Sequence, residues 1–292
     1  MSIYCTGDTH GKDIIPWSYG IDGYKNRLSM TAFPEQADMS KEDYIIICGD
    51  FGGVWDTNRY AFEESEDEKE GLDWLENKSF TTLFVPGNHE NYHRLTGCHR
   101  IELLHGWFYE NMPKEEKGKL QSGYPRKAWH GGFVREIRPS VLMLEAGVFN
   151  IDGKTCFAYG GAQSHDIDGG ILKPWEFDED EFNVIAKDGL GFSRIYGVSW
   201  WPEEQPSAET EHNAIEALKR VDCNVDFVFT HCPAASDQRQ LGFAGNTRID
   251  KFLETVKQNA GFKHWFCGHL HINTDLPGGK THVVYEQILR IN

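Results

Sequence analysis

Histidine, aspartate and asparagine gather at five places in the 292-residue sequence, each just after a short apolar run. Imidazole nitrogens with carboxylate and amide oxygens suit Mn, Fe, Zn, Ni or Co better than thiolate-bound metals do. Seven such groups exceed one tetrahedral site, so they predict two divalent or trivalent ions that share a carboxylate. Two-metal sites of this kind are typical of phosphatases and nucleases. The candidate ligands are Asp8, His10, Asp50, Asn88, His231, His269 and His271, with Asp50 as the shared carboxylate.

The apolar runs before these residues have the length and composition of β-strands. Because strand carboxyl ends meet at one edge of a sheet, side chains that follow them are expected to converge there. Glycines beside four of the five clusters permit tight turns and a close approach to a bound group. The predicted strands cover residues 3–5, 44–48, 81–85, 226–230 and 264–267.

Helical patterns lie between several of these runs. The clearest covers residues 248–258, and another is expected from the N-cap Ser207 to about Arg220. Residues 141–152 and 154–162 instead predict paired β-strands. Alternating strands and helices favour an α/β layered domain with a mixed sheet system.

In order along residues 8–271, the motifs D-x-H, G-D, G-N-H-E, a lone His and G-H-x-H resemble the calcineurin-like metallophosphoesterase superfamily. The resemblance implies a two-sheet mixed β-sandwich flanked by helices. It also implies that one metal ion is bound by Asp8, His10 and His271, and the other by Asn88, His231 and His269. Asp50 would then bridge the two ions.

The same resemblance implies a reaction and a second set of residues. A hydroxide held between the ions would attack phosphorus, since metal coordination lowers the pKa of bound water. His89 matches the position of the general acid, and Glu90 could hold its imidazole through a hydrogen bond. The implied activity is hydrolysis of a phosphoester, by a phosphatase or a phosphodiesterase.

One departure leaves the substrate open. Protein serine/threonine phosphatases carry G-D-x-V-D-R-G at the second motif, whereas this chain has G-D-F-G-G-V-W at residues 49–55 and lacks the arginine. A small-molecule or a protein-borne phosphoester therefore fits equally. A metal-binding scaffold without activity and a nuclease are the alternatives.

The composition limits the classes of substrate and the cellular location that we expect. The net charge of −16, from 45 acidic against 29 basic residues, disfavours long nucleic acid as a substrate. Seven cysteines without a C-x-x-C pair indicate neither a zinc-thiolate site nor a disulfide framework. Without a leader pattern or an apolar run of about 18 residues, we expect a cytoplasmic protein with no membrane segment.

No linker divides the chain, so residues 1–292 are predicted to form a single domain. Residues 105–135 show poor periodicity and predict a long loop or insertion. Three further features are expected to have structural roles and not functional ones. Residues 164–170 are interpreted as a polar turn, residues 200–204 as aromatic side chains packed at the base of a loop, and Arg94 as a solvated side chain.

Overall fold

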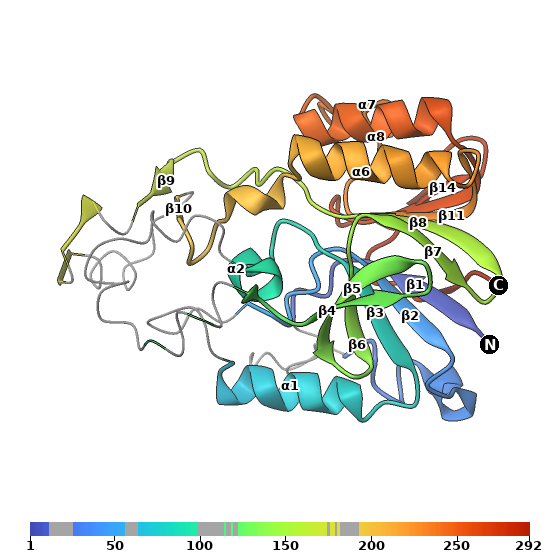
Figure 1. Ribbon diagram of the computed structural model, residues 1–292, viewed down its shortest axis with the longest axis horizontal. Coiled ribbons are helices and arrows are strands. Elements are labelled where there is room, and N and C mark those ends of the chain that lie inside the picture. The colour runs from blue at the N-terminus through green and yellow to red at the C-terminus, as the bar shows by residue number, and fades with distance from the viewer. Residues whose placement is uncertain are drawn as a thin grey trace.

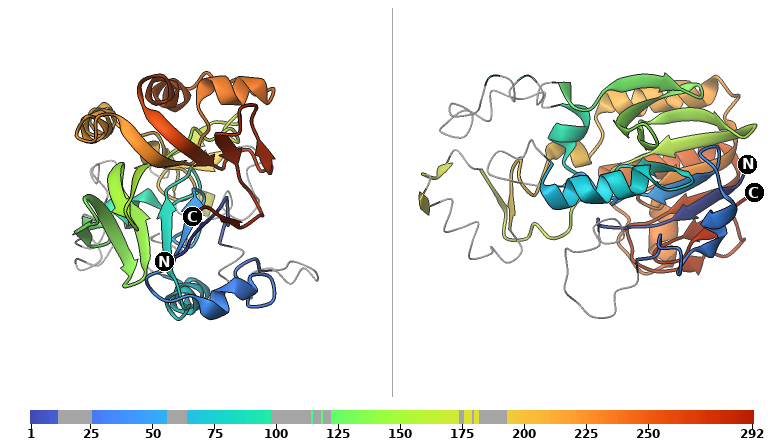
Figure 2. Two further views of the ribbon diagram at one scale, coloured as in Figure 1. Left: turned by 90° about the vertical axis from the view of Figure 1, so that its right-hand side faces the viewer. Right: turned by 90° about the horizontal axis from the view of Figure 1, so that it is seen from below.

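The computed structural model describes residues 1–11, 26–55, 64–97, 122–173, 176–178 and 193–292, together with the single positions 114, 118, 180 and 181. Two large mixed β-sheets face each other across a shared core, and helices cover their outer faces (Figures 1 and 2). This arrangement confirms the predicted α/β class with two sheets flanked by helices.

The first sheet is built around a group of parallel strands. Its members are β1 (Ile3–Thr6), β2 (Tyr44–Cys48), β3 (Thr81–Val85), β4 (Arg126–Trp129), β5 (Gly132–Arg138), β6 (Val141–Leu144) and β15 (Leu289–Arg290). They lie in the order β15-β1-β2-β3-β6-β5-β4, with β1, β2, β3 and β6 parallel. β1, β2 and β3 are buried along their whole length, as expected for central parallel strands.

The second sheet has a similar parallel centre. Its members are β7 (Gly147–Ile151), β8 (Lys154–Tyr159), β11 (Asn224–Thr230), β12 (Gly261–Cys267), β13 (Thr274–Asp275) and β14 (Thr281–Val283). They lie in the order β13-β14-β12-β11-β8-β7, with β8, β11, β12 and β14 parallel. β9 (Ile171–Leu172) and β10 (Arg194–Ile195) form a separate parallel pair.

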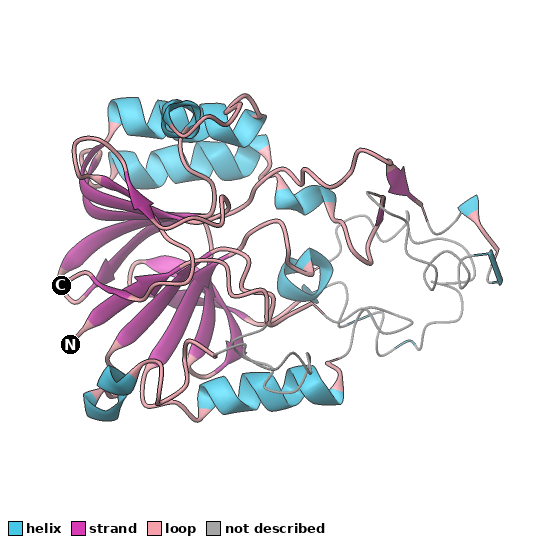
Figure 3. Cartoon of the chain, turned by 180° about the vertical axis from the view of Figure 1, so that it is seen from behind, coloured by secondary structure: helices cyan, strands magenta, loops and turns pink. Residues whose placement is uncertain are grey.

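Helices pack on both outer faces (Figures 1 and 3). Leu72 and Leu75 of α1 (Glu66–Glu76) pack with Ile45 and Ile47 of β2. On the other face, buried side chains of two helices pack against the second sheet. The described helices are α1 (Glu66–Glu76), α2 (Tyr92–Thr96), α6 (Ala208–Lys219), α7 (Ala235–Gln240) and α8 (Arg248–Asn259), with 3-10 turns η1 (Pro34–Asp38) and η4 (Pro202–Glu204).

Side-chain caps start the two helices that the sequence predicted. Ser207 accepts a hydrogen bond from the backbone N–H of Thr210 at the start of α6, as its N-cap assignment requires. Thr247 and Asp250 form a reciprocal capping box at the start of α8. Both predicted helices are confirmed, and so are the five predicted strands.

The segment 141–152 differs from the prediction of a strand paired with the next one. It holds two strands, because the chain crosses from the first sheet to the second at Glu145 and Ala146. β6 pairs with β3 and β5, whereas β7 pairs with β8. Both strands send side chains into the core between the sheets, so an apolar pattern cannot distinguish their sheets.

The end of the segment predicted as a long loop or insertion is regular structure. β4 and β5 pair as an antiparallel hairpin at the edge of the first sheet. Residues 105–121 lie outside the described residues, apart from 114 and 118. A single domain over 1–292 stays a prediction. None of the described helices is both long enough and apolar enough to cross a membrane.

Candidate metal centre

The seven candidate ligands all follow the carboxyl ends of parallel strands. Asp8 and His10 come after β1, Asp50 after β2, and Asn88 after β3, in the first sheet. His231 comes directly after β11, and His269 and His271 come after β12, in the second sheet. The site therefore lies where the loops of both sheets meet, and the structure brings residues from positions 8 to 271 into one cluster.

One half of the cluster is centred on His231. Its Nδ1 lies 3.1 Å from the carbonyl oxygen of Cys48, which can only accept, so Nδ1 carries the proton. Nε2 is then left with a lone pair. It faces Oδ1 of Asn88 at 3.1 Å and Nδ1 of His269 at 3.2 Å. A metal ion placed among these three atoms could accept their lone pairs.

The other half contains His10 and His271, whose Nε2 atoms lie 3.0 Å apart. Nε2 of His271 is 3.8 Å from Oδ1 of Asp8. One ligand atom from each of Asp8, His10, Asp50 and His271 fits within 4.8 Å of the others. This spacing is suitable for the coordination shell of an ion bound by nitrogen and oxygen.

Asp50 belongs to both halves. Its Oδ1 lies 3.3 Å from Nε2 of His231, and its Oδ2 lies 3.8 Å from Nε2 of His10. The backbone N–H of His89 also donates to Oδ1, at 2.8 Å, which fixes the carboxylate plane. A carboxylate with one oxygen toward each half has the geometry that a bridging ligand requires.

The backbone around the cluster adopts rare conformations. His10, Asp50, His269 and His271 have φ values of 48°, 44°, 69° and 52°, in the left-handed region that non-glycine residues seldom occupy. Such strain concentrates at functional sites, where surrounding structure holds it in place. A Cβ on Gly49, whose φ is +88°, would lie 2.0 Å from Nδ1 of His231. Only glycine allows this close approach.

Burial and neighbouring charges shift the pKa values of these groups in different directions. Burial raises the pKa of Asp8 well above its usual range, and the charge of Asp50 raises it further. The pKa of Asp50 is lowered although burial opposes this, because His231 and other imidazoles surround it. Burial also lowers the pKa of His10 and of His269 to about 3, so both imidazoles stay neutral and free to bind metal.

A family model described as calcineurin-like phosphoesterase matches residues 1–273. The chain belongs to this family. No protein of curated function matches its sequence.

The solved structures that match this calcineurin-like phosphoesterase include three of low sequence identity. A protein assigned as a 5'-nucleotidase from Staphylococcus aureus, in complex with alpha-ketoglutarate, has 13% identity and a TM-score of 0.43; the match covers 97% of this chain but 48% of that one, about half its length. Phosphopantetheinyl hydrolase from Mycobacterium tuberculosis has 15% identity, a TM-score of 0.37, and coverage of 98% and 90%. The cold-active protein-tyrosine phosphatase of a psychrophilic Shewanella species has 13% identity, a TM-score of 0.31, and coverage of 98% and 71%.

His89 lies at the rim of the centre in this calcineurin-like phosphoesterase. Its half-buried ring meets the ring of His10 edge-on at 5.1 Å and lies 5.6 Å from the ring of Trp55. Burial lowers the pKa of His89, an effect that the charge of Asp50 opposes. The ring therefore faces the ligand set without belonging to it.

The expected hydrogen bond from Glu90 to the His89 imidazole is not formed, which corrects that expectation. Glu90 is fully buried and points into the loop after β2. Its Oε1 accepts from the backbone N–H of Phe51 at 2.7 Å, and its Oε2 accepts from Gly52 at 3.4 Å. Glu90 thus holds the loop that carries Asp50, since a buried carboxylate takes the nearest unpaired backbone donors.

Two residues that the sequence interpretation left out of the site support Asn88. Nδ2 of Asn88 donates to Oγ of Ser164 at 3.4 Å, and Oγ of Ser164 donates to Oε2 of Glu204 at 2.6 Å. The backbone N–H of Ser164 also donates to Oε1 of Glu204, at 2.8 Å. Burial raises the pKa of Glu204 to about 7. The signal for Ser164 was present: it follows β8 and the pair Gly160-Gly161, as the ligands follow their strands.

The remaining weaker candidates have structural contacts. Arg94 is buried rather than solvated, and forms a two-fold ion pair with Glu68 of α1. Trp201 is fully buried and packs edge-on against Trp55 at 5.4 Å, in agreement with the packing interpretation of residues 200–204.

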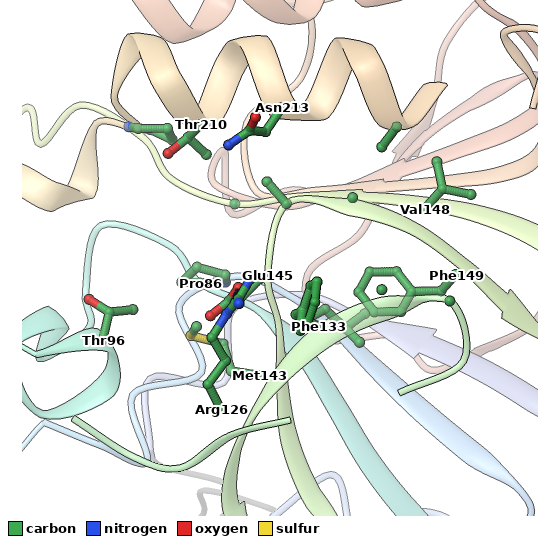
Figure 4. Close-up of a pocket in the computed structure, with 18 of the residues that line it drawn as sticks. Pro86, Thr96, Arg126, Phe133, Met143, Glu145, Val148, Phe149, Thr210 and Asn213 are labelled. Atoms are coloured by element: carbon green, nitrogen blue, oxygen red, sulfur yellow. Dashed lines mark hydrogen bonds and ion pairs between the residues drawn. The ribbon is translucent and has the colours of Figure 1, made fainter. Parts of the chain in front are cut away.

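A separate cavity of about 850 Å³ lies beside α6 and contains none of the seven candidate ligands in its lining. In Figure 4, Thr210 and Asn213 face it from α6, while Arg126 and Glu145 lie on the opposite side. Nε of Arg126 is paired with Glu145 at 2.8 Å, and its guanidinium covers the ring of Phe133. Ligand chemistry, rather than cavity size, therefore identifies the candidate centre.

Proposed function

We propose that this chain hydrolyses a phosphoester with two metal ions bound in the candidate centre. His231, Asn88 and His269 would hold one ion, Asp8, His10 and His271 the other, and Asp50 both. The observation that carries the proposal is the position of Asp50, with Oδ1 near His231 at 3.3 Å and Oδ2 near His10 at 3.8 Å.

The ions, when bound, would supply a water molecule of lowered pKa and neutralise charge on the phosphate oxygens. The chain itself supplies neutral imidazoles, because burial lowers the pKa of His10 and His269 to about 3. It also holds Asp8 in place, through the backbone N–H of His269 at 3.0 Å and 3.1 Å from the two carboxylate oxygens.

His89 is the proposed proton donor to the leaving oxygen. Its ring lies beside His10 but makes no hydrogen bond with a described residue that would occupy its nitrogens. A bound phosphoester brings negative charge, which would raise the pKa of His89 and favour its protonated form. The same charge would hold the ring toward the substrate.

The proposed substrate is a small-molecule phosphoester. The chain carries 45 acidic and 29 basic residues, so its overall field does not attract a polyanionic backbone. The arginine that the protein serine/threonine phosphatases carry in the second motif is missing from residues 49–55.

Hydrolysis of p-nitrophenyl phosphate and bis-p-nitrophenyl phosphate tests the proposal. Metal-stripped protein would be assayed with Mn²⁺, Ni²⁺, Zn²⁺, Fe²⁺ or Mg²⁺ restored separately. Activity that needs metal supports hydrolysis, and the ratio of the two rates separates a monoesterase from a diesterase. Protein that binds metal but hydrolyses neither compound, nor a pyrophosphate, would overturn the proposal.

A further inference from the structure

A second group of side chains whose types can bind metal lies on three neighbouring strands, β12, β14 and the edge strand β13, of the second sheet. His264 is on β12, His282 on the neighbouring β14, and Asp275 on β13. Nδ1 of His264 lies 2.9 Å from Nε2 of His282, and Nδ1 of His282 lies 2.6 Å from Oδ1 of Asp275. None of these three residues belongs to the candidate dinuclear centre.

Strand register produces this arrangement. His282 is paired with Phe266 on β12 and with Asp275 on β13. His264 lies two residues before Phe266, on the same face of β12, because side chains alternate along a strand. His264 and His282 are therefore diagonal neighbours across two strands, within reach of each other.

Asp275 determines which nitrogen of His282 is available. Its carboxylate accepts the proton of Nδ1, so Nε2 of His282 carries a lone pair directed at His264. His264 can hold its proton on Nε2, which leaves a lone pair on Nδ1. The carboxylate–histidine arrangement is the usual support for a histidine that binds metal.

Aromatic packing holds both rings in place. The ring of Phe266 is stacked on His282 at 4.9 Å with an angle of 18° between their planes. It also lies 6.1 Å from the ring of His264 at 28°. Because Phe266 is buried in the core between the sheets, the two imidazoles are preorganised.

The site is open to solvent on one side. A cavity of about 520 Å³ is lined by His264 and His282 together with Asp275, Gln287 and Arg290. A metal ion could enter there, and water molecules could complete its coordination shell.

We propose that His264 and His282 bind a divalent ion of the copper and nickel class, through Nδ1 and Nε2, with Asp275 orienting His282. With metal–nitrogen bonds of roughly 2.0–2.1 Å, nitrogens 2.9 Å apart subtend an angle of about 90° at the ion. That angle belongs to a tetragonal ion, which Cu²⁺ and Ni²⁺ favour, whereas tetrahedral Zn²⁺ would separate the nitrogens by about 3.3 Å.

The ion would link β12 to β14, and Asp275 would connect β13 to the same site through its hydrogen bond to His282. β12 ends at Cys267 before the loop that carries His269 and His271, and β13 begins at Thr274 after that loop. An ion that binds the folded chain and not the unfolded one stabilises the fold by mass action. Ni²⁺ is therefore expected to raise the melting temperature through this site as well as through the dinuclear centre.

Equilibrium dialysis with Ni²⁺ tests the site. Wild type is expected to bind one equivalent more than His264→Ala or His282→Ala, whereas His212→Ala, which removes an exposed histidine of α6, should match wild type. Asp275→Asn should keep the equivalent with about 10- to 100-fold weaker affinity. Equal stoichiometry in wild type and both folded histidine variants would overturn the proposal.

Histidine NMR keeps the test valid if a variant fails to fold. The dinuclear centre of wild-type protein would first be filled with Zn²⁺ in place of any other metal. Substoichiometric Ni²⁺ added to this sample should then broaden the ring signals of His264 and His282. The signals of the exposed His130 and His212 serve as the control. Ni²⁺ that binds without broadening either ring of the pair would also overturn the proposal.

Discussion

Nδ2 of Asn88 donates a hydrogen bond of 3.4 Å to Oγ of Ser164, and this contact directs Oδ1 of Asn88 toward Nε2 of His231 at 3.1 Å. Ser164 can accept from the amide because its own proton goes to Glu204 at 2.6 Å. Without these two hydrogen bonds the Asn88 amide could rotate and present its NH₂ group to a metal ion. Outer partners of this kind typically affect metal affinity as well as ligand orientation.

Ser164→Ala and Glu204→Gln should each weaken metal binding by about 10- to 100-fold. The reason is that each variant removes the restraint on the Asn88 amide. The free energy of metal binding should therefore change more than the free energy of unfolding does. Metal titration by calorimetry measures the effect, with Glu209→Gln, an exposed acid of α6, as the matched control. Unchanged affinity in both variants would show that Asn88 needs no such restraint.

Asp50→Asn should reduce the bound metal from two equivalents to one at most and abolish hydrolysis, because an amide bridges two cations poorly. Elemental analysis after gel filtration counts the ions, and circular dichroism checks the fold. Asp38→Asn changes an exposed aspartate in the same way and should keep both equivalents. Two equivalents in Asp50→Asn would contradict the bridging role.

His89→Ala should lower kcat by about 10²- to 10⁴-fold for an alkyl phosphate, whose leaving oxygen needs a proton. The loss should be much smaller for p-nitrophenyl phosphate, since p-nitrophenolate leaves without protonation. His130→Ala, at an exposed position, is the control. Equal losses for the two substrates would indicate that His89 positions the phosphate instead of donating a proton.

In the metal-free protein, burial of His10 and His269 should cost stability as the pH falls from about 6.5 toward 3, an effect that the raised pKa values of Asp8 and Glu204 oppose. Burial lowers the pKa of His10 and of His269 from 6.5 to about 3, so these two imidazoles bind more protons in the unfolded chain than in the folded one in this window. At pH 5 each imidazole would contribute a loss of about 2 kcal/mol. Urea unfolding at pH 7 and pH 5 measures it. The change in the free energy of unfolding between pH 7 and pH 5 should be smaller in His269→Gln than in wild type. An identical change in the two proteins would contradict the contribution of His269.

Arg94→Met should destabilise the protein by about 3–5 kcal/mol, because it leaves the buried carboxylate of Glu68 without its partner. KM should stay unchanged, since Arg94 binds Glu68 and not phosphate. Urea unfolding and steady-state kinetics separate the two effects. The double variant Arg94→Met/Glu68→Leu should recover much of the lost stability, whereas a raised KM at unchanged stability would favour a phosphate contact.

The local elements and the candidate ligands could be predicted from the amino-acid sequence alone. Strand-length runs such as residues 44–48 and 81–85 match β2 and β3, and the capped pattern after Thr247 matches α8. These features depend on neighbours within a few residues, where periodicity and capping act. The order of ligands after strands could also be predicted, because each ligand lies within a few residues of the strand that precedes it.

Contacts between side chains that are far apart in the sequence could not be predicted, because they depend on the tertiary fold. Asn88 and Ser164 are 76 residues apart, and Ser164 and Glu204 are 40 apart, so no local pattern links them. Arg94 was predicted to be solvated, but it is buried because the fold brings Glu68 beside it. β6 and β7 belong to different sheets, which only their strand pairing shows. A side chain's charge, burial and hydrogen bonds depend on what packs against it, and packing joins segments whose separation along the chain carries no signal.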